Sequence, residues 1–317
     1  MATEQGTESE TGRDEQPERD VGPFTRWVQN SIDDPQRAYR AMFYVLTIFF
    51  LLTTLFPFYW LLVLALTPES ALSNIGLLPN GFNPGAFVTV FERVPFHIYM
   101  FNSFVIALAS TVMVLILGSL AGYVFGRLRF PGRGPLMLLL LAISFFPPVG
   151  FILPLFRLFT GNIEVLGVSS PMLYNTPLAI MLPAGAIYMP LSIFILTTFY
   201  SQIPDGLEDA ARIEGTTRLG ALFRVIIPLS APGVATAGVL SFIYVYNEFF
   251  FSFLMTNGEA SNWSPIVWGI LGYQTQYTAS YNLMAAASIV GVLPVAILVV
   301  VAQEKIVSGL TSGALKE

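Results

Sequence analysis

The stretch that decides the fold is IPDGLEDAARIEGTTRLGALFRVIIPLSAPG, residues Ile203–Gly233, which lies between long apolar segments. It carries seven charged residues. Asp205, followed three residues later by Glu208, has the pattern of a capping box at a helix start, and Gly215 is a suitable helix stop. The helix between them has about nine residues, too few to be stable alone in water. We therefore expect it to dock against another surface.

Small and apolar residues share one face of this predicted helix. Leu207, Ala210 and Ala211 are spaced i, i+3 and i+4, so their side chains are neighbours. The two alanines allow a partner to approach closely. Beside this face, Glu208 and Arg212 are predicted to form an i, i+4 ion pair.

A second short helix is expected to begin at Thr216 or Thr217 and to end before Pro228. Its apolar stripe comprises Leu219, Leu222, Phe223 and Ile226. Two short amphipathic helices meeting at a sharp angle indicate a loop that lies at a membrane surface. The alternative is an ordinary surface helix between two membrane spans.

The composition is that of an integral membrane protein. The 317 residues are 54% hydrophobic and 11% charged, with a mean hydropathy of +0.67. Because backbone groups in lipid must hydrogen-bond within their own segment, we predict an all-α membrane protein with six transmembrane helices. The uncharged runs long enough to span are Ala41–Leu66, Asn102–Gly126, Pro135–Leu155, Pro171–Tyr200, Val225–Tyr246 and Leu283–Ala302.

The basic residues predict the orientation of these spans. Of the fifteen Lys and Arg residues, all except Arg93 and Arg157 fall on one side. By the positive-inside rule, both termini and the loop at 203–233 are cytoplasmic. Residues 1–40 are predicted to be a cytoplasmic, acidic and largely disordered tail.

The charged stretch resembles the EAA loop of ABC-importer permeases, which reads E-A-A-x-x-x-G followed by I-x-L-P. The first part is matched by Asp209, Ala210, Ala211 and Gly215. Ile226–Leu229 matches the second part, and Asp209 stands where Glu is usual, next to Glu208. The resemblance implies a coupling helix that sits in a groove on a cytoplasmic ATPase subunit. Its implied contact residues are Leu207, Glu208, Asp209, Ala210, Ala211, Arg212 and Gly215.

Other phrases are similar to the same family in the same order. The pair Asn102-Ser103 resembles the start of the family's second span, and Gly122–Arg127 resembles the run that ends it. The final residues resemble the ending G-L-T-x-G-x-x-K-G of the maltose-type second permease. Gly309, Leu310, Thr311, Gly313 and Lys316 match it, with Glu317 in place of the last Gly. The resemblance implies a type I ABC-importer permease fold, with residues 41–317 as the transmembrane permease domain.

Polar residues at the outer end of the fifth predicted span suggest a translocation pathway. Asn247 and Glu248 lie in an apolar stretch, where an ionisable residue is a functional candidate. The phrase resembles the family's W-N-E-F, with Tyr246 replacing Trp, and Tyr244 adds another ring face for a sugar. These four residues are our candidate pathway. The alternative is an aromatic belt at the outer interface, with Glu248 near the headgroups.

The energy source must lie outside this chain. It has no phosphate-binding loop of the form G-x-x-x-x-G-K-[ST], so it is not the ATPase and is not predicted to be an enzyme. The resemblance implies alternating access driven by two ATPase subunits that bind ATP and Mg²⁺, with no cofactor in this chain. The other implied partners are a second permease subunit, an extracellular or periplasmic solute-binding protein, a sugar and membrane lipid, with no nucleic acid.

Rival functions predict features that this sequence does not share. A permease for a non-sugar solute disagrees with the resemblance of the C-terminal residues to the maltose-type ending. An ion-coupled secondary transporter needs buried carboxylates in several spans, and only Glu248 is a candidate. A respiratory membrane subunit needs haem-ligating histidines, and His97 is the single histidine. The absence of cysteine also excludes disulfides and thiolate metal sites. The resemblance therefore implies a multi-pass permease in the plasma or inner membrane that imports di- or oligosaccharides.

Overall fold

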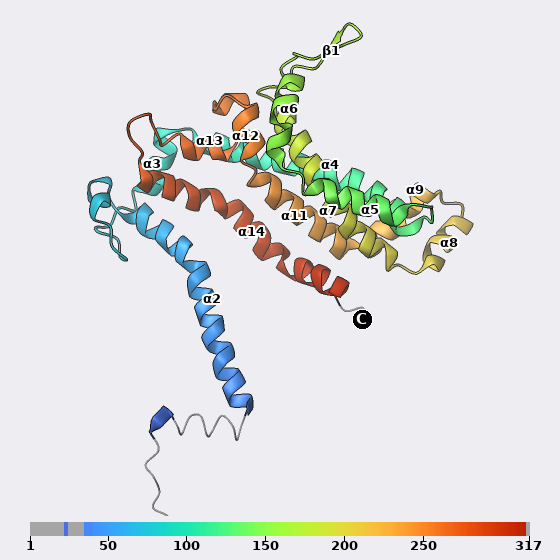
Figure 1. Ribbon diagram of the computed structural model, residues 1–317, viewed down its shortest axis with the longest axis horizontal. Helices are drawn as coiled ribbons and strands as arrows, with labels where there is room; N and C mark the ends of the chain where they lie inside the picture. Colours follow the sequence, from blue (N-terminus) through green and yellow to red (C-terminus); the bar gives the residue numbers. More distant parts are fainter. Residues whose placement is uncertain (1–21, 25–34, 315–317) are drawn as a thin grey trace, which may run out of the picture. The chain divides into compact units, whose positions relative to one another are not determined.

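The computed structural model describes residues 22–24 and 35–314, and helices make up most of the described chain (Figure 1). The longer helices are α2 (Pro35–Leu66), α4 (Phe96–Arg127), α5 (Arg133–Ser144), α7 (Pro177–Ser201), α11 (Ala231–Tyr246) and α14 (Tyr281–Ala314). The shorter ones are η1 (Glu69–Asn74), α3 (Ala86–Arg93), η2 (Pro148–Phe151), α6 (Ile152–Phe159), α8 (Asp205–Ile213), α9 (Arg218–Ala221), η3 (Leu222–Ile226), α10 (Ile227–Leu229), α12 (Phe250–Met255), η4 (Ala260–Asn262) and α13 (Ile266–Leu271). The described strands are β1 (Glu164–Val165) and β2 (Val168–Ser169), which pair as one antiparallel hairpin.

The chain divides into two units, Met1–Tyr59 and Trp60–Glu317. In the first unit, the described part of α2 carries large apolar side chains that are almost all exposed. Such a helix suits lipid, where its backbone groups are already bonded internally. Most of the predicted tail at 1–40, and Lys316 of the predicted C-terminal motif, lie outside the described residues. The boundary at residue 40 stays a prediction.

Four described helices are long and apolar enough to cross a membrane: Tyr39–Leu66, Phe96–Arg127, Pro177–Ser201 and Tyr281–Gln303. Two further segments pass the same test only as bent pairs. Counting each bent pair as one span gives the six predicted spans and confirms the all-α class, apart from the small β-hairpin.

The third predicted span, Pro135–Leu155, is not one helix. Its first part is α5, which ends at Ser144, and the following segment Pro148–Phe159 is bent by 86° relative to α5. Pro147 and Pro148 lie at this break, and neither has a backbone N–H to continue the helix. The prediction of a continuous span is therefore wrong here, for a reason already visible in the sequence.

The fifth predicted span, Val225–Tyr246, begins later than expected. The segment Arg218–Leu229 meets α11 at 86°, and Ser230 lies at the corner. Pro232 occupies the first turn of α11, where a missing N–H costs nothing. The start at Val225 is thus wrong, because Val225–Leu229 belongs to the preceding short helix.

A stripe of glycines allows α4 and α7 to pack closely. Gly118, Gly122 and Gly126 recur every four residues on α4 and face α7. A Cβ built on Gly122 would lie 2.9 Å from Cβ of Leu196, and one on Gly126 would lie 3.1 Å from Cβ of Tyr200. Small residues at this spacing are typical of close helix pairs in membranes. The stripe brings the last turns of the two helices side by side.

We predict that Gly122→Leu destabilises the bundle by about 1–3 kcal/mol, because the added side chain overpacks the contact with α7. The measurement is the thermal unfolding midpoint of the detergent-solubilised protein. Gly134→Leu is the matched control, because nothing lies within 4 Å of a Cβ at that position. Equal midpoints for the two variants would contradict close α4–α7 packing.

Candidate functional site

The predicted pair of short helices is present, but the second one continues through Pro228 to Leu229, so the predicted end before Pro228 is wrong. α8 runs over Asp205–Ile213 and is followed by Gly215 at φ +91°, a left-handed conformation that favours glycine. The next helix begins after Thr217, whose hydroxyl accepts a hydrogen bond from the N–H of Gly220 at 3.1 Å. The predicted stop at Gly215 and the second start at Thr217 are therefore confirmed.

The predicted capping box at the start of α8 is wrong. Pro204 occupies the N-cap position, and Asp205 is the first helical residue, without a side-chain cap bond. The carboxylate of Asp205 instead lies 2.9 Å from a guanidinium nitrogen of Arg127 on α4. The ion pair with Arg127 has replaced the local helix cap. This contact with a residue distant in the sequence cannot be predicted from the local sequence.

Glu208 is the one buried residue of α8. Its carboxylate accepts hydrogen bonds from the hydroxyl of Tyr123 and, at 2.8 Å, from Nε of Arg127. The predicted Glu208–Arg212 ion pair is therefore wrong. Arg212 lies 3.6 Å from the carboxylate of Asp209, and both of these side chains are largely exposed.

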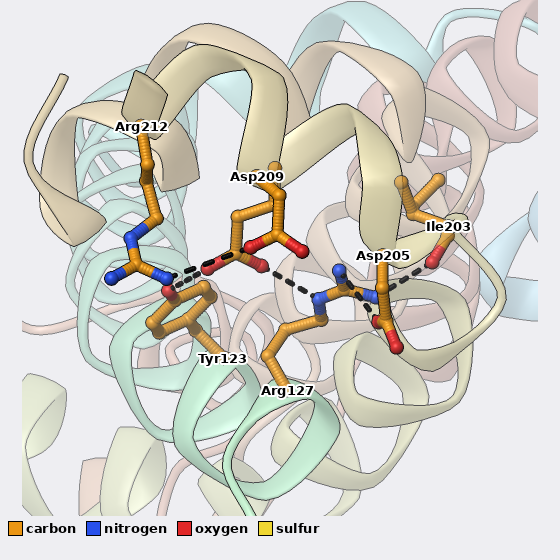
Figure 2. A network of polar contacts seen from close by, with 7 residues as sticks. Tyr123, Arg127, Ile203, Asp205, Asp209 and Arg212 are labelled. Carbon is orange, nitrogen blue, oxygen red and sulfur yellow. Dashed lines mark hydrogen bonds and ion pairs between the residues drawn. The ribbon is translucent and has the colours of Figure 1, made fainter. Parts of the chain in front are cut away.

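Arg127 holds the start of α8 at three points, as Figure 2 shows. Its Nε donates to Glu208, one terminal nitrogen donates to the carbonyl of Ile203 at 2.6 Å, and the other pairs with Asp205. The Arg127 side chain is only 4% exposed. A guanidinium so far from water needs acceptors for its donors, and these three contacts supply them.

The same contacts determine the ionisation of Glu208. Burial alone raises the pKa of this carboxyl, but the hydrogen bonds from Tyr123 and Arg127 and the nearby guanidinium charges bring it below its ordinary value. A lowered pKa in the folded state means that the ionised form stabilises the docked helix. This stabilisation is present at neutral pH and is lost as the pH falls through the lowered pKa.

The apolar side of α8 points away from the bundle. Leu207 is 46% and Ile213 is 87% exposed, and Ala210 between them is also exposed. A helix on a globular surface normally buries its apolar side, so α8 is inverted, with its acidic side bound inward. We did not select Ile213 from the sequence, although its spacing of three residues from Ala210 and six from Leu207 was the available signal.

The following helix is embedded more deeply than α8. Leu222 and Ile226 are buried and pack in one cluster with Tyr123 of α4 and with Leu196 and Tyr200 of α7. The other two residues of the predicted stripe, Leu219 and Phe223, are exposed. This cluster supports the loop from the side of the bundle.

The four candidate pathway residues lie around the break between α11 and α12. Tyr246 is buried and donates its hydroxyl to the carbonyl of Gly291 at 2.9 Å. Tyr244 is partly exposed and packs against Tyr188, with ring centroids 5.0 Å apart. Asn247 is exposed. The structure thus places the rings of Tyr244 and Tyr246 in different surroundings.

Glu248 is buried, and its carboxylate caps α12. It accepts hydrogen bonds from the N–H groups of Phe251 and Ser252 at 2.7 and 2.9 Å, and from the Ser252 hydroxyl at 2.9 Å. Sequence reasoning missed this cap because the apolar run continues through the break. Its signal was the i+3 and i+4 spacing of a carboxylate ahead of a short helix.

Comparison with known proteins gives consistent matches. The family described as binding-protein-dependent transport system inner membrane component matches residues 114–311. The sulfoquinovosyl glycerol transport system permease protein SmoH of Agrobacterium fabrum is 37% identical, covering 84% of this chain and 90% of that protein. The trehalose transport system permease protein SugB of Mycobacterium tuberculosis is 34% identical, covering 83% and 92%. The trehalose/maltose transport system permease protein MalG of Thermococcus litoralis is 32% identical, covering 87% and 97%.

A solved structure shows the same fold. It is the crystal structure of a bacterial ABC transporter involved in the import of the acidic polysaccharide alginate. The match has a TM-score of 0.67 and 19% sequence identity, and it covers 86% of this chain and 97% of that chain.

We predict that Glu208→Gln loosens α8 from α4, because the amide cannot carry the charge that Arg127 requires. Loss of a charge-assisted hydrogen bond costs about 1.5–3 kcal/mol, so amide hydrogen exchange across α8 should rise by roughly ten- to a hundredfold. Asp209→Asn is the control, since its side chain is exposed and its ion pair is long. Unchanged exchange in the Glu208 variant would show that α8 is held by other contacts.

Proposed function

The chain belongs to the family of binding-protein-dependent transport system inner membrane components, and we propose that it is one of two permease subunits of an ATP-driven carbohydrate importer. The proposal rests mainly on the inverted α8, which is bound inward by acidic groups and turns its apolar side outward. An exposed apolar side on an ordered short helix is suited to a protein partner. In this proposal the partner is a cytoplasmic ATPase subunit.

The coupling residues are divided between two tasks. Leu207, Ala210 and Ile213 form the outward side, which would enter a groove on the ATPase. Ala211, Asp209 and Arg212 lie beside it, and Gly215 ends the helix that carries them. Glu208 and Asp205 bind the permease itself through Arg127. Movement of the ATPase groove would thus carry α8 and the bundle together.

The remaining partners follow from what this chain lacks and from its charge distribution. The sequence has no phosphate-binding loop, so two ATPase subunits would bind ATP and Mg²⁺. The positive-inside rule supports placing both termini and α8 in the cytoplasm. A second permease subunit would complete the pathway, and an external solute-binding protein would deliver the substrate, with alternating access between the two sides.

The relatives support a carbohydrate as substrate. The proteins named above are permeases for sulfoquinovosyl glycerol, for trehalose, and for trehalose and maltose. A further relative, of Bacillus subtilis, is named for melibiose, raffinose and stachyose import. We propose a di- or oligosaccharide. A non-sugar solute is the alternative within the same transport class.

For the pathway, we propose that Tyr244 and Asn247 contact the sugar. Tyr244 offers a partly exposed ring backed by Tyr188, and Asn247 is an exposed amide beside it. Tyr246 and Glu248 would support this surface from behind, because the first is buried and the second caps α12. A lipid-facing aromatic belt is the alternative for Tyr244.

The test is reconstitution of the chain with its cognate subunits in proteoliposomes, followed by measurement of ATP-dependent uptake of trehalose, maltose and sulfoquinovosyl glycerol. We predict uptake that requires the loaded binding protein, and loss of sugar-stimulated ATPase activity in Ala210→Trp, because an indole does not fit where a small residue faces a docked partner. Gly134→Trp is the control, since that position is open. Stimulation of the Ala210 variant at the wild-type level would overturn the coupling role of α8.

We also predict that Glu248→Gln lowers uptake several-fold while assembly and basal ATPase activity remain. The neutral amide keeps one acceptor for the cap and loses the charge behind Asn247. Ser252→Ala is the matched control, because it removes a hydrogen bond from the same carboxylate without changing the charge. Equal losses in both variants would mean that only the helix cap matters.

A further inference from the structure

One helix connects α8 with the opposite end of the second unit. α4 is a continuous helix of 32 residues without a proline, about 48 Å long at 1.5 Å per residue. Figure 1 shows α8 and α9 at one end of the bundle, with α3 and α13 at the other. Both ends of α4 carry side chains that hydrogen-bond to segments distant in the sequence.

At the α8 end, two residues of α4 form hydrogen bonds and ion pairs with the segment from Ile203 to Glu208. Tyr123 donates to Glu208, and Arg127 contacts Glu208, Asp205 and the carbonyl of Ile203. We refer to Tyr123 and Arg127 as the inner clamp. α8 buries no apolar residue of its own, so the inner clamp attaches it to α4 through polar groups alone.

At the α13 end, three residues of α4 hold the loop between α12 and α13. Asn102 donates from Nδ2 to the carbonyls of Ala260 and Ser264, at 2.8 and 3.0 Å. The hydroxyl of Ser103 accepts from the N–H of Ile266 at 2.8 Å. In addition, Tyr99 donates its hydroxyl to the carbonyl of Gly258 at 2.8 Å. We refer to Tyr99, Asn102 and Ser103 as the outer clamp.

The outer clamp fixes backbone rather than side chains. All three of its residues are buried, and their partners are main-chain groups of residues 258–266. A buried carbonyl or N–H without such a partner is costly, so the loop follows α4 when α4 moves. The inner clamp has the same effect on α8, through charge instead of neutral hydrogen bonds.

We propose that α4 transmits movement between the ATPase-coupling helix α8 and the loop at residues 257–265, with the inner and outer clamps as its positioning residues. The inference rests on the proposed function, which supplies the driving movement at α8. It adds that the signal passes through α4 and not only through α7, the helix that directly precedes α8 in the chain. Coupling between the two sites is reciprocal, so a ligand that binds the 257–265 loop also changes the binding of a partner at α8.

The experiment uses the full reconstituted complex and compares tyrosine-to-phenylalanine variants, which remove one hydroxyl and keep the ring. Tyr99→Phe opens part of the outer clamp, and Tyr123→Phe opens part of the inner clamp. Tyr273→Phe is the control, because this buried hydroxyl also donates to a backbone carbonyl, that of Val90, but lies off α4. The readout is stimulation of ATPase activity by the cognate binding protein loaded with trehalose or maltose, beside basal ATPase activity.

We expect each α4 variant to lower the stimulation about fivefold, the equivalent of one hydrogen bond, with basal activity unchanged. The double variant should lose little more than the larger single loss, because either open clamp already interrupts the same helix. Losses that multiply in the double variant, equal loss in Tyr273→Phe, or full stimulation in both single variants would each overturn the proposal. Absence of sugar-dependent stimulation in the wild type would instead overturn the proposed function.

Discussion

The contact between Arg127 and Glu208 fixes the position of the charged loop on the bundle. Both groups are almost fully buried, and each would be costly alone, because a charge removed from water must be compensated at short range. The carbonyl of Ile203, Asp205 and the hydroxyl of Tyr123 complete the set of partners. Since polar groups supply the attachment, the apolar residues Leu207 and Ile213 of α8 are left exposed. The inversion of this amphipathic helix is therefore a consequence of the ion pair.

The ion pair in turn depends on close packing in the last two turns of α4. Gly126 allows Tyr200 to lie against α4, and Gly122 does the same for Leu196. With larger side chains at these positions, the last turn of α7 would stand away from α4. The carbonyl of Ile203, two residues beyond the end of α7, would then be out of reach of Arg127. The small residues Gly122 and Gly126 thus bring the end of α7 close enough to α4 for Arg127 to reach the carbonyl of Ile203.

The sequence predicted local features well and tertiary partners poorly. The stop of α8 at Gly215 and the second helix start at Thr217 follow from capping and backbone preferences of a few neighbouring residues. The partners of Glu208 lie about eighty residues away on another helix, and local spacing favoured Arg212 instead. Prolines lie at or beside the bends at 145–147 and 230, but a hydropathy average over a long window does not detect a bend within an apolar segment.

Two buried glutamates with the same physical task explain why an acidic residue beside a span is easily misread. Glu208 follows the end of α7 and belongs to the short helix α8. Glu248 follows the end of α11 and precedes the short helix α12. Neither short helix would be stable in isolation. Glu208 holds its helix by the side, through Arg127, whereas Glu248 holds its helix by the first turn, through N–H groups. A carboxylate with two oxygens can satisfy several donors at once, which makes it an efficient anchor where the chain turns. The default reading of an intramembrane acid as a substrate group must therefore be weighed against the number of donors it already accepts. By that measure the neutral, exposed Asn247 has more hydrogen-bonding groups left free for other partners than the charged Glu248 beside it.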